Sequence, residues 1–168
     1  MFGWLAGGDE LNRQCREHVQ KHGSLFCGQV FSSSPGNLPC KVVVHTVGPV
    51  WRDGTRNEEK DLEKAVRGAL DACRTHKTVS LPAISCGIFG FPGHLAAEVT
   101  IRTIRDFMMT ESSVSRVDIV ITRKDVITEF HRALMDAFGT EKVSKLTETF
   151  ISSSPADTGY KLLFCKQI

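Results

Sequence analysis

The chain has 168 residues, of which 41% are hydrophobic and 24% charged, and its formal net charge is +2 at pH 7. This length suits one domain with a sizeable core and is short for two. The near balance of charge argues against duplex nucleic acid or an anionic membrane as the partner. No apolar run approaches the roughly 20 residues that are needed to span a bilayer.

The cysteines are scattered at positions 15, 27, 40, 73, 86 and 165, without a Cys-x-x-Cys pair. This spacing argues against a structural zinc site and against a disulfide framework. The opening residues have neither the basic segment nor the long apolar segment of a signal peptide. We therefore expect reduced thiols and a cytoplasmic or nuclear location, with no metal.

The first predicted helix begins at Asp9, a favourable N-cap residue, and ends at Gly23. Its expected buried stripe is Leu11, Cys15, Val19 and His22. Residues 28–31 predict a short strand, and the residues that follow are rich in turn formers. Residues 41–47 give the strongest β signal, because their β-branched run does not alternate with polar residues. This pattern predicts a strand buried on both faces.

The second predicted helix has Asn57 as its N-cap and two acidic residues in its first turn. Its buried stripe is Leu62, Val66, Ala69, Leu70 and Cys73. A short buried strand is predicted from residue 78 to 81, and a helix from 93 to 109. In that helix Glu98 and Arg102 are expected to form an exposed i,i+4 pair, opposite the inward residues Ala97, Ile101, Ile104 and Met108.

The last predicted strand spans residues 117–121, and Asp125 then starts a helix that Gly139 closes. The inward residues of this helix are Val126, Phe130, Leu134 and Ala137. Strand and helix alternate from position 41 to 139 without hairpin dipeptides, which predicts parallel strands joined by right-handed helical crossovers. We expect an α/β fold with three layers, α/β/α, and a mostly parallel sheet, in a domain of residues 1–139.

The tail, residues 140–168, breaks this alternation and is expected to be a linker followed by an uncertain end. Residues 160–165 are compatible with a strand, with the start of another domain or with a disordered end, and the sequence leaves the three open.

Residues 81–92 join the predicted strand at 78–81 to the next helix, and they hold two glycines, two aromatic residues and a serine. We call residues 85–91 the glycine loop. Glycines let backbone N–H groups approach an anion, and a helix N-terminus adds partial positive charge. Such turns are also ordinary α/β connections, so phosphate binding and a plain connection both stay open on this evidence.

The segment from Pro82 to Pro92 resembles the second ligand loop of the macrodomain family. The segment from Leu38 to Pro49 is similar to the strand that precedes this loop in the family. Residues 6–11 resemble the first helix region in macrodomains of multi-domain ADP-ribosyltransferases. The resemblance runs in order from about residue 6 to residue 139, and the string Ser-x-Gly-x-Phe-Gly is its most specific part.

The macrodomain family binds ADP-ribose, free or attached to proteins, and some of its members hydrolyse the attached form. The resemblance implies that the glycine loop wraps the diphosphate and distal ribose of ADP-ribose through Ser85, Cys86, Gly87, Ile88, Phe89, Gly90 and Phe91. The backbone N–H groups of residues 86–90 would be the phosphate donors, at about 1.5–3 kcal/mol for each charge-assisted bond. Phe89 would lie against the ribose, and no cofactor is implied beyond the ligand itself.

In that family, opening strands and a loop with Asn-Ala-Ala-Asn and Gly-Gly-Gly precede the first helix. The chain starts at Met1, and the resemblance implies that this first ligand loop and one inner strand are absent. We therefore expect an N-terminally truncated domain from a larger multi-domain parent, with weakened ligand binding and exposed strand edges. Residues 160–165 are a candidate to fill the vacant sheet position.

Cys86 lies near a helix N-terminus, where a thiol can act as a nucleophile with His45 or His94 as its base. The position needs only a small residue, and no acid–histidine partner is spaced recognisably, so we expect no catalytic residue. His45 is predicted to be a hydrogen-bonded core histidine. His94 is predicted to be solvated.

Two polar or aromatic positions outside the loop have weaker signals. Trp51 is expected to pack on the edge of the core rather than flank a pocket. Arg123 and Lys124 follow the last strand at its ligand end, where a solvated loop is the default and an approach to adenine or phosphate is the alternative.

The sequence thus predicts a non-catalytic binding module for ADP-ribose or mono-ADP-ribosylated protein. The alternative is a hydrolase that removes ADP-ribose from proteins, and a third possibility is a generic binder of nucleotide phosphates. The missing first loop favours the binding module, because hydrolytic members use that loop to place the ribose and a water molecule.

Overall fold

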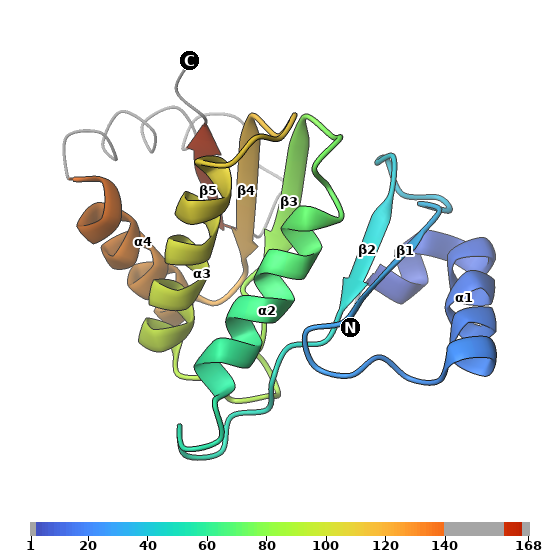
Figure 1. Ribbon diagram of the computed structural model, residues 1–168, viewed down its shortest axis with the longest axis horizontal. Helices are drawn as coiled ribbons and strands as arrows, with labels where there is room; N and C mark the ends of the chain where they lie inside the picture. The colour runs from blue at the N-terminus through green and yellow to red at the C-terminus, as the bar shows by residue number, and fades with distance from the viewer. Residues whose placement is uncertain (1–2, 140–159, 166–168) are drawn as a thin grey trace.

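The computed structural model describes residues 3–139 and 160–165. The elements, in chain order, are α1 (Gly3–His22), β1 (Val30–Ser33), β2 (Val43–Thr46), α2 (Glu58–Asp71), β3 (Thr78–Pro82), α3 (Gly93–Met108), β4 (Arg116–Ile121), α4 (Lys124–Phe138) and β5 (Tyr160–Cys165). Every predicted helix is present within these ranges, and the α/β class is confirmed (Figure 1). None of the described helices is long and apolar enough to cross a membrane.

The strands form two sheets, one with the order β1-β2 and one with the order β3-β4-β5. β3 and β4 are parallel, as predicted for a strand–helix–strand unit, with Val79 opposite Val117. β1 and β2 are antiparallel, with Phe31 opposite His45, and β5 is antiparallel to β4. β5 therefore extends the far edge of β4 and does not lie between β2 and β3. Of the three possibilities for residues 160–165, the strand is the one confirmed.

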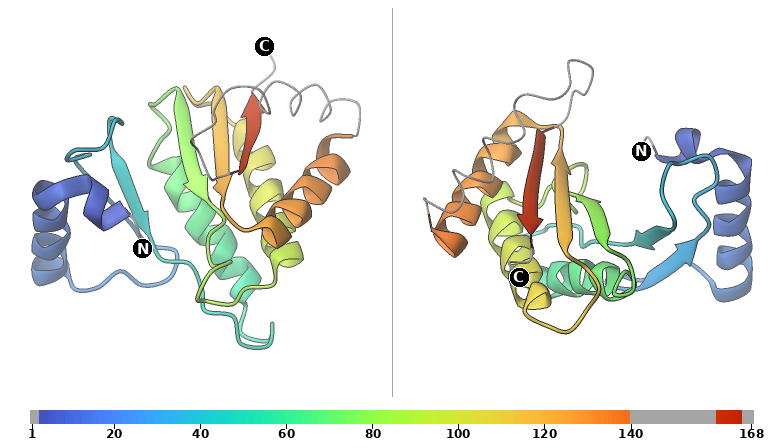
Figure 2. Two further views of the ribbon diagram at one scale, coloured as in Figure 1. Left: turned by 180° about the vertical axis from the view of Figure 1, so that it is seen from behind. Right: turned by 90° about the horizontal axis from the view of Figure 1, so that it is seen from above.

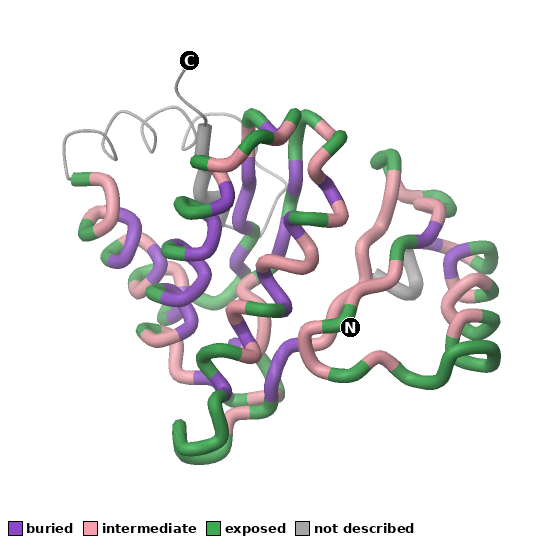
Figure 3. The backbone as a smooth tube through the Cα atoms, in the orientation of Figure 1, coloured by how far each residue is buried: buried purple, intermediate pink, exposed green. Residues whose placement is uncertain are grey.

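The main core lies between the second sheet and three helices. Helices α2, α3 and α4 cover one face of β3, β4 and β5 (Figure 2). The largest fully buried side chains are Phe107, Phe130, Leu62, Leu70, Ile101, Ile104, Ile119 and Leu134. In the helices, apolar residues recur with the 3.6-residue period and so face the sheet. The inward residues predicted for α2, α3 and α4 are buried or half-buried. Figure 3 shows the buried backbone concentrated in this part of the molecule.

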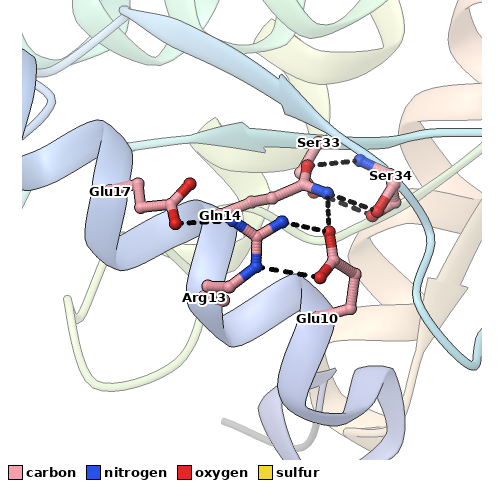
Figure 4. Close-up of polar contacts among 6 residues, drawn as sticks. All are labelled: Glu10, Arg13, Gln14, Glu17, Ser33 and Ser34. Carbon is pink, nitrogen blue, oxygen red and sulfur yellow. Dashed lines mark hydrogen bonds and ion pairs between the residues drawn. The ribbon is translucent and has the colours of Figure 1, made fainter.

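The first sheet contacts a helix on each side. β1 contacts both α1 and α2, so a helix–sheet–helix layering is present here. Gln14 of α1 binds Ser34, the residue after β1, through its side-chain amide, which donates to Ser34 Oγ at 2.7 Å and accepts the Ser34 N–H at 2.9 Å (Figure 4). Arg13 bonds Glu10 and Glu17 on the exposed side of the same helix.

The first helix and β2 differ from the sequence prediction in burial. Gly8 has non-helical angles, φ 73° and ψ −173°, so a helical segment does begin at the predicted N-cap, Asp9. The predicted stripe was wrong at Val19 and His22, which are exposed, because β1 and β2 are too short to cover the end of the helix. β2 was predicted to be buried on both faces, but all four of its residues are only half-buried, since among the described strands only β1 pairs with it.

One predicted ion pair was also wrong. Arg102 of α3 does not pair with Glu98 but lies 3.8 Å from a carboxylate oxygen of Glu63 on α2. Helices α2 and α3 pack side by side, so the neighbouring helix offers a carboxylate in closer reach than the same helix does. Both side chains are about half exposed, and such pairs contribute roughly 0–1 kcal/mol to stability.

Candidate functional site

The glycine loop leaves the carboxyl end of β3 and leads into α3. Two of its residues have positive φ, Ser85 at 64° and Gly90 at 66°. Pro92 is the N-cap of α3, with φ −58°. It directly precedes the helix that the sequence predicts from residue 93. The position costs the helix no hydrogen bond, because proline has no N–H to leave unpaired. The loop therefore turns sharply twice before the helix begins.

The N–H groups of the loop differ in whether the protein itself provides an acceptor. The N–H groups of Cys86 and Gly90 donate within the loop, to Ala83 O at 3.3 Å and to Gly87 O at 3.0 Å. Among the described residues, no acceptor takes the N–H of Gly87, Ile88 or Phe89. Of the five donors predicted for a phosphate, three consecutive ones are thus available and two have internal acceptors. Consecutive N–H groups in a turn form a concave site for an anion.

The loop touches the end of β2 at Gly48. A Cβ added to Gly48 would lie 2.3 Å from Ser85 Oγ and 2.5 Å from Ile84 Cγ2, distances that no real side chain tolerates. Ser85 Oγ is itself buried, and within the described part of the chain it has no hydrogen-bond partner. A side chain here would push the loop away, so the absence of a side chain at Gly48 sets how closely the exit of β2 approaches the loop.

Trp51 supports the loop from behind. The backbone N–H of Trp51 donates to Phe89 O at 2.8 Å. The indole ring packs against Phe91 with centroids 4.7 Å apart and planes tilted by 60°. Such tilted aromatic pairs add about 0.5–1.5 kcal/mol beyond the area they bury. The prediction that Trp51 packs on the core is confirmed.

A cavity of about 210 Å³ lies beside the loop. Its lining residues are Cys86, Phe91, Gly93, His94, Arg123, Asp125, Val126 and Glu129. Arg123 Nη1 donates to Cys86 O at 2.8 Å, and its guanidinium also pairs with Asp125. Arg123 therefore contacts the glycine loop, although the sequence indicated a solvated loop as the default. His94 is exposed at the rim, as predicted.

Burial governs the thiol of Cys86. The side chain is 4% exposed, and this burial raises the pKa of the thiol to about 11, a rise that the nearby Arg123 charge only partly opposes. The thiol is therefore protonated at neutral pH and is a poor nucleophile. His45 cannot act as its base, because His45 lies on β2 within 2.9 Å of Ser33 Oγ and 3.6 Å of Cys15 Sγ. His45 is thus half-buried and hydrogen-bonded, as predicted.

A model of the macro domain family matches residues 5–100, which is more than half of the chain and includes the whole glycine loop. The chain belongs to the macro domain family. 

Named relatives agree with this assignment. The O-acetyl-ADP-ribose deacetylase of Citrobacter koseri is 35% identical over 131 residues, which cover 77% of this chain and 74% of that protein. The protein of the same name from Escherichia fergusonii is 40% identical over 105 residues, or 61% of this chain and 59% of that one. The chain thus spans about three fifths of the E. fergusonii relative.

Solved structures show the same fold. A variant of the Oceanobacillus iheyensis macrodomain, solved with ADPR, superposes with a TM-score of 0.74 at 27% identity, and the match covers 82% of this chain and 76% of that one. The same macrodomain solved with ADP gives a TM-score of 0.73. The macro domain fold predicted from the glycine loop is therefore confirmed.

Within this macro domain the predicted site residues fall into two groups. Cys86 and Phe91 belong to the buried core, each 4% exposed, and both also line the cavity beside the loop. Ile88 is 91% exposed at the tip of the loop, and Gly87 and Gly90 are exposed beside it. Phe89 is half-buried between the two groups.

The contacts that support the loop of this macro domain were not predicted from the sequence. Glu58, the first residue of α2, is 3% exposed, and its carboxylate accepts N–H groups from the turn that follows Trp51. Sequence reasoning placed Glu58 only as a favourable acid in a first helical turn. Among the described residues, no group of three or more histidine, cysteine, aspartate or glutamate side chains is placed to hold a metal ion.

Proposed function

We propose that this macro domain binds ADP-ribose, free or attached to a protein, through the glycine loop. The observation that carries the proposal is the row of three N–H groups at Gly87, Ile88 and Phe89, for which the described residues provide no acceptor. A diphosphate supplies acceptors of the right charge, and each charge-assisted bond is worth about 1.5–3 kcal/mol. The likeness to macrodomain structures solved with ADPR and with ADP supports this choice of ligand.

The side chains of the loop support binding of ADP-ribose without catalysis. The thiol of Cys86 is buried, and the burial raises its pKa so that it is protonated at neutral pH. Ser85 has its hydroxyl buried against Gly48. Neither group is activated by a neighbouring base, which a nucleophile of this kind requires.

Titration calorimetry with ADP-ribose tests the proposal directly. A second titration with Gly87→Ala sharpens it, because a Cβ at Gly87 would meet no atom of the described residues within 4 Å. That substitution should leave the free energy of unfolding nearly unchanged and weaken ADP-ribose binding at least about tenfold, since the methyl group would enter the space of the diphosphate. Undetectable binding by the unsubstituted chain would refute the proposal, and equal affinity for ADP and ADP-ribose would favour a generic nucleotide-phosphate binder.

A second function is favoured by the relatives alone. Two of them are named O-acetyl-ADP-ribose deacetylases, and hydrolysis of an ester on ADP-ribose, or removal of ADP-ribose from protein, is the corresponding activity. The cheap test is incubation with O-acetyl-ADP-ribose and with an ADP-ribosylated protein, followed by measurement of released acetate and ADP-ribose. Turnover with either substrate would replace the binding module by an enzyme. Origin in a multi-domain ADP-ribosyltransferase, and a cytoplasmic or nuclear location, stay predictions.

A further inference from the structure

Glu58 is a buried carboxylate that the proposed binding site does not use directly. Its side chain is 3% exposed at the start of α2. Oε1 accepts the N–H groups of Arg52 and Gly54, each at 3.3 Å, and Oε2 accepts the N–H of Arg56 at 2.7 Å. A carboxylate is removed from water only when hydrogen bonds replace its hydration. Glu58 therefore holds both ends and the middle of the turn of residues 52–56, and Asp53 adds a local contact by accepting the N–H and the hydroxyl of Thr55.

The closed turn leads to the glycine loop in one step. Trp51 immediately precedes the turn, and its N–H donates to Phe89 O. A Cβ at Gly54 would lie 3.0 Å from the Trp51 ring, so the middle of the turn presses on the same indole. The same ring packs against Phe91. A chain of contacts thus joins Glu58, the turn, Trp51 and the glycine loop.

We propose that Glu58 is a positioning residue for the glycine loop, which fixes Phe89 and its neighbours in the conformation that a diphosphate requires. This inference rests on the proposed function of the loop, but its structural part can be measured without ligand. Glu58 touches no ligand atom in this account. It acts by holding the turn, which holds Trp51, which holds Phe89.

The carboxylate, rather than any polar group of its size, is what the geometry needs. Both of its oxygens accept, so a glutamine would turn an amide NH₂ toward at least one N–H donor. The side chain of the N-cap residue Asn57 does not help to cap the helix, because Asn57 has φ 61° and makes no side-chain cap bond. A general preference for acids near a helix N-terminus is a separate effect, since Glu59 also lies in the first turn and is exposed.

Glu59→Gln is therefore the matched control for Glu58→Gln. Both substitutions remove one charge from the same helical turn, and only one removes an acceptor of the turn's N–H groups. Each is made in a Trp4→Phe background, because the chain has two tryptophans and Trp51 is then the only fluorophore of its kind. Three quantities are measured: ADP-ribose affinity, the emission maximum of Trp51, and hydrogen exchange of the Trp51 amide.

The expected result for Glu58→Gln is a loss of at least about tenfold in ADP-ribose affinity, a red-shifted Trp51 emission and faster exchange at the Trp51 amide. Glu59→Gln should change none of the three. Glu58→Asp keeps the charge on a shorter side chain and should give intermediate values of affinity, emission and exchange. This variant takes the place of Glu58→Gln if Glu58→Gln does not fold. Unchanged affinity in a folded Glu58→Gln variant, or lost affinity without any Trp51 response, would overturn the inference.

The same experiment separates this inference from the proposed function. If the unsubstituted chain does not bind ADP-ribose, the proposed function fails, and the exchange rate of the Trp51 amide still decides whether Glu58 holds the loop. Faster exchange in Glu58→Gln alone then supports the positioning role, and equal exchange in both variants overturns it.

Discussion

Gly48, two residues after the end of β2, lies directly against Ser85 of the glycine loop. We expect Gly48→Ala to cost about 1–3 kcal/mol in the free energy of unfolding, because the new methyl group collides with Ser85 and Ile84. It should also weaken ADP-ribose binding, since relief of the collision moves the loop. Denaturant unfolding and calorimetry measure the two effects. Gly93→Ala is the control for stability, because a Cβ there would lie no closer than 3.6 Å to its nearest neighbour; an equal loss in both variants would contradict the prediction.

The thiol of Cys86 should resist modification at neutral pH. With a pKa raised to about 11 and an exposed fraction of 4%, it should react with a maleimide far more slowly than the exposed Cys40. Mass spectrometry of a partial labelling time course gives both rates. Rapid labelling of Cys86 in the native protein would show that the loop opens often, or that the thiol is activated.

At the scale of single residues, the sequence identified the loop but not its inner hydrogen bonds. The glycines and the serine at residues 85–90 left phosphate binding and a plain connection both open, and only the resemblance to macrodomains implied a ligand loop. The internal acceptors of the Cys86 and Gly90 N–H groups depend on the positive φ of Ser85, which no propensity predicts for a serine. The roles of Glu58 and Arg123 depend on where their loops fold back, and this is tertiary information.

Among the elements, β2 carries a titratable group in its half-buried surface. Burial lowers the pKa of His45, and the charge of His18 on α1 lowers it further. His45 also faces Cys15 of α1 and Ser33 of β1, and it stacks on Phe31. All of these neighbours accommodate the neutral ring. The sheet β1–β2 and helix α1 are therefore packed around an uncharged imidazole.

A folded-state pKa below the usual 6.5 means that the unfolded chain binds the proton more readily. The stability linked to His45 is therefore fully present above about pH 6.5 and is lost as pH falls from there toward the folded pKa. We expect the free energy of unfolding to drop between about pH 7.5 and about pH 5.5, and to drop less in His45→Gln. Urea unfolding at both pH values measures this. His94→Gln, at an exposed position, should keep the full drop, and an undiminished drop in His45→Gln would refute the assignment.

Helices were predicted correctly from the sequence where the period of apolar residues and the capping residues agreed. Helix α4 runs from Lys124 to Phe138, with Gly139 at its end, as the Asp125 and Gly139 signals indicated. Prediction failed where pairing decides the outcome. The run of valines at residues 42–44 has the composition of a doubly buried strand, but burial of a strand requires neighbours, and composition does not reveal which strands pair.

For the whole molecule, burial is distributed unequally along the chain. From residue 7 to residue 47, Leu11 is the only large apolar side chain that is buried, whereas α2, α3, α4, β3 and β4 hold almost all of the core. We expect amide protons of β1 and β2 to exchange through openings of lower free energy than those of β3 and β4. Native-state hydrogen exchange in rising denaturant tests this directly. Equal opening free energies for both sheets would mean that the molecule unfolds as one unit.

The hydrogen bond between Trp51 and Phe89 has a thermodynamic consequence in the reverse direction. If Glu58 raises affinity by holding the loop, reciprocity requires that a bound ligand stabilise the closed turn by the same free energy. Saturating ADP-ribose should then slow exchange at the N–H groups of Arg52, Gly54 and Arg56, which donate to Glu58 from the turn before α2. Hydrogen exchange in the turn of residues 52–56 would thus show whether ADP-ribose is bound to the glycine loop. Substitutions in that turn would change the affinity for ADP-ribose without altering the binding surface.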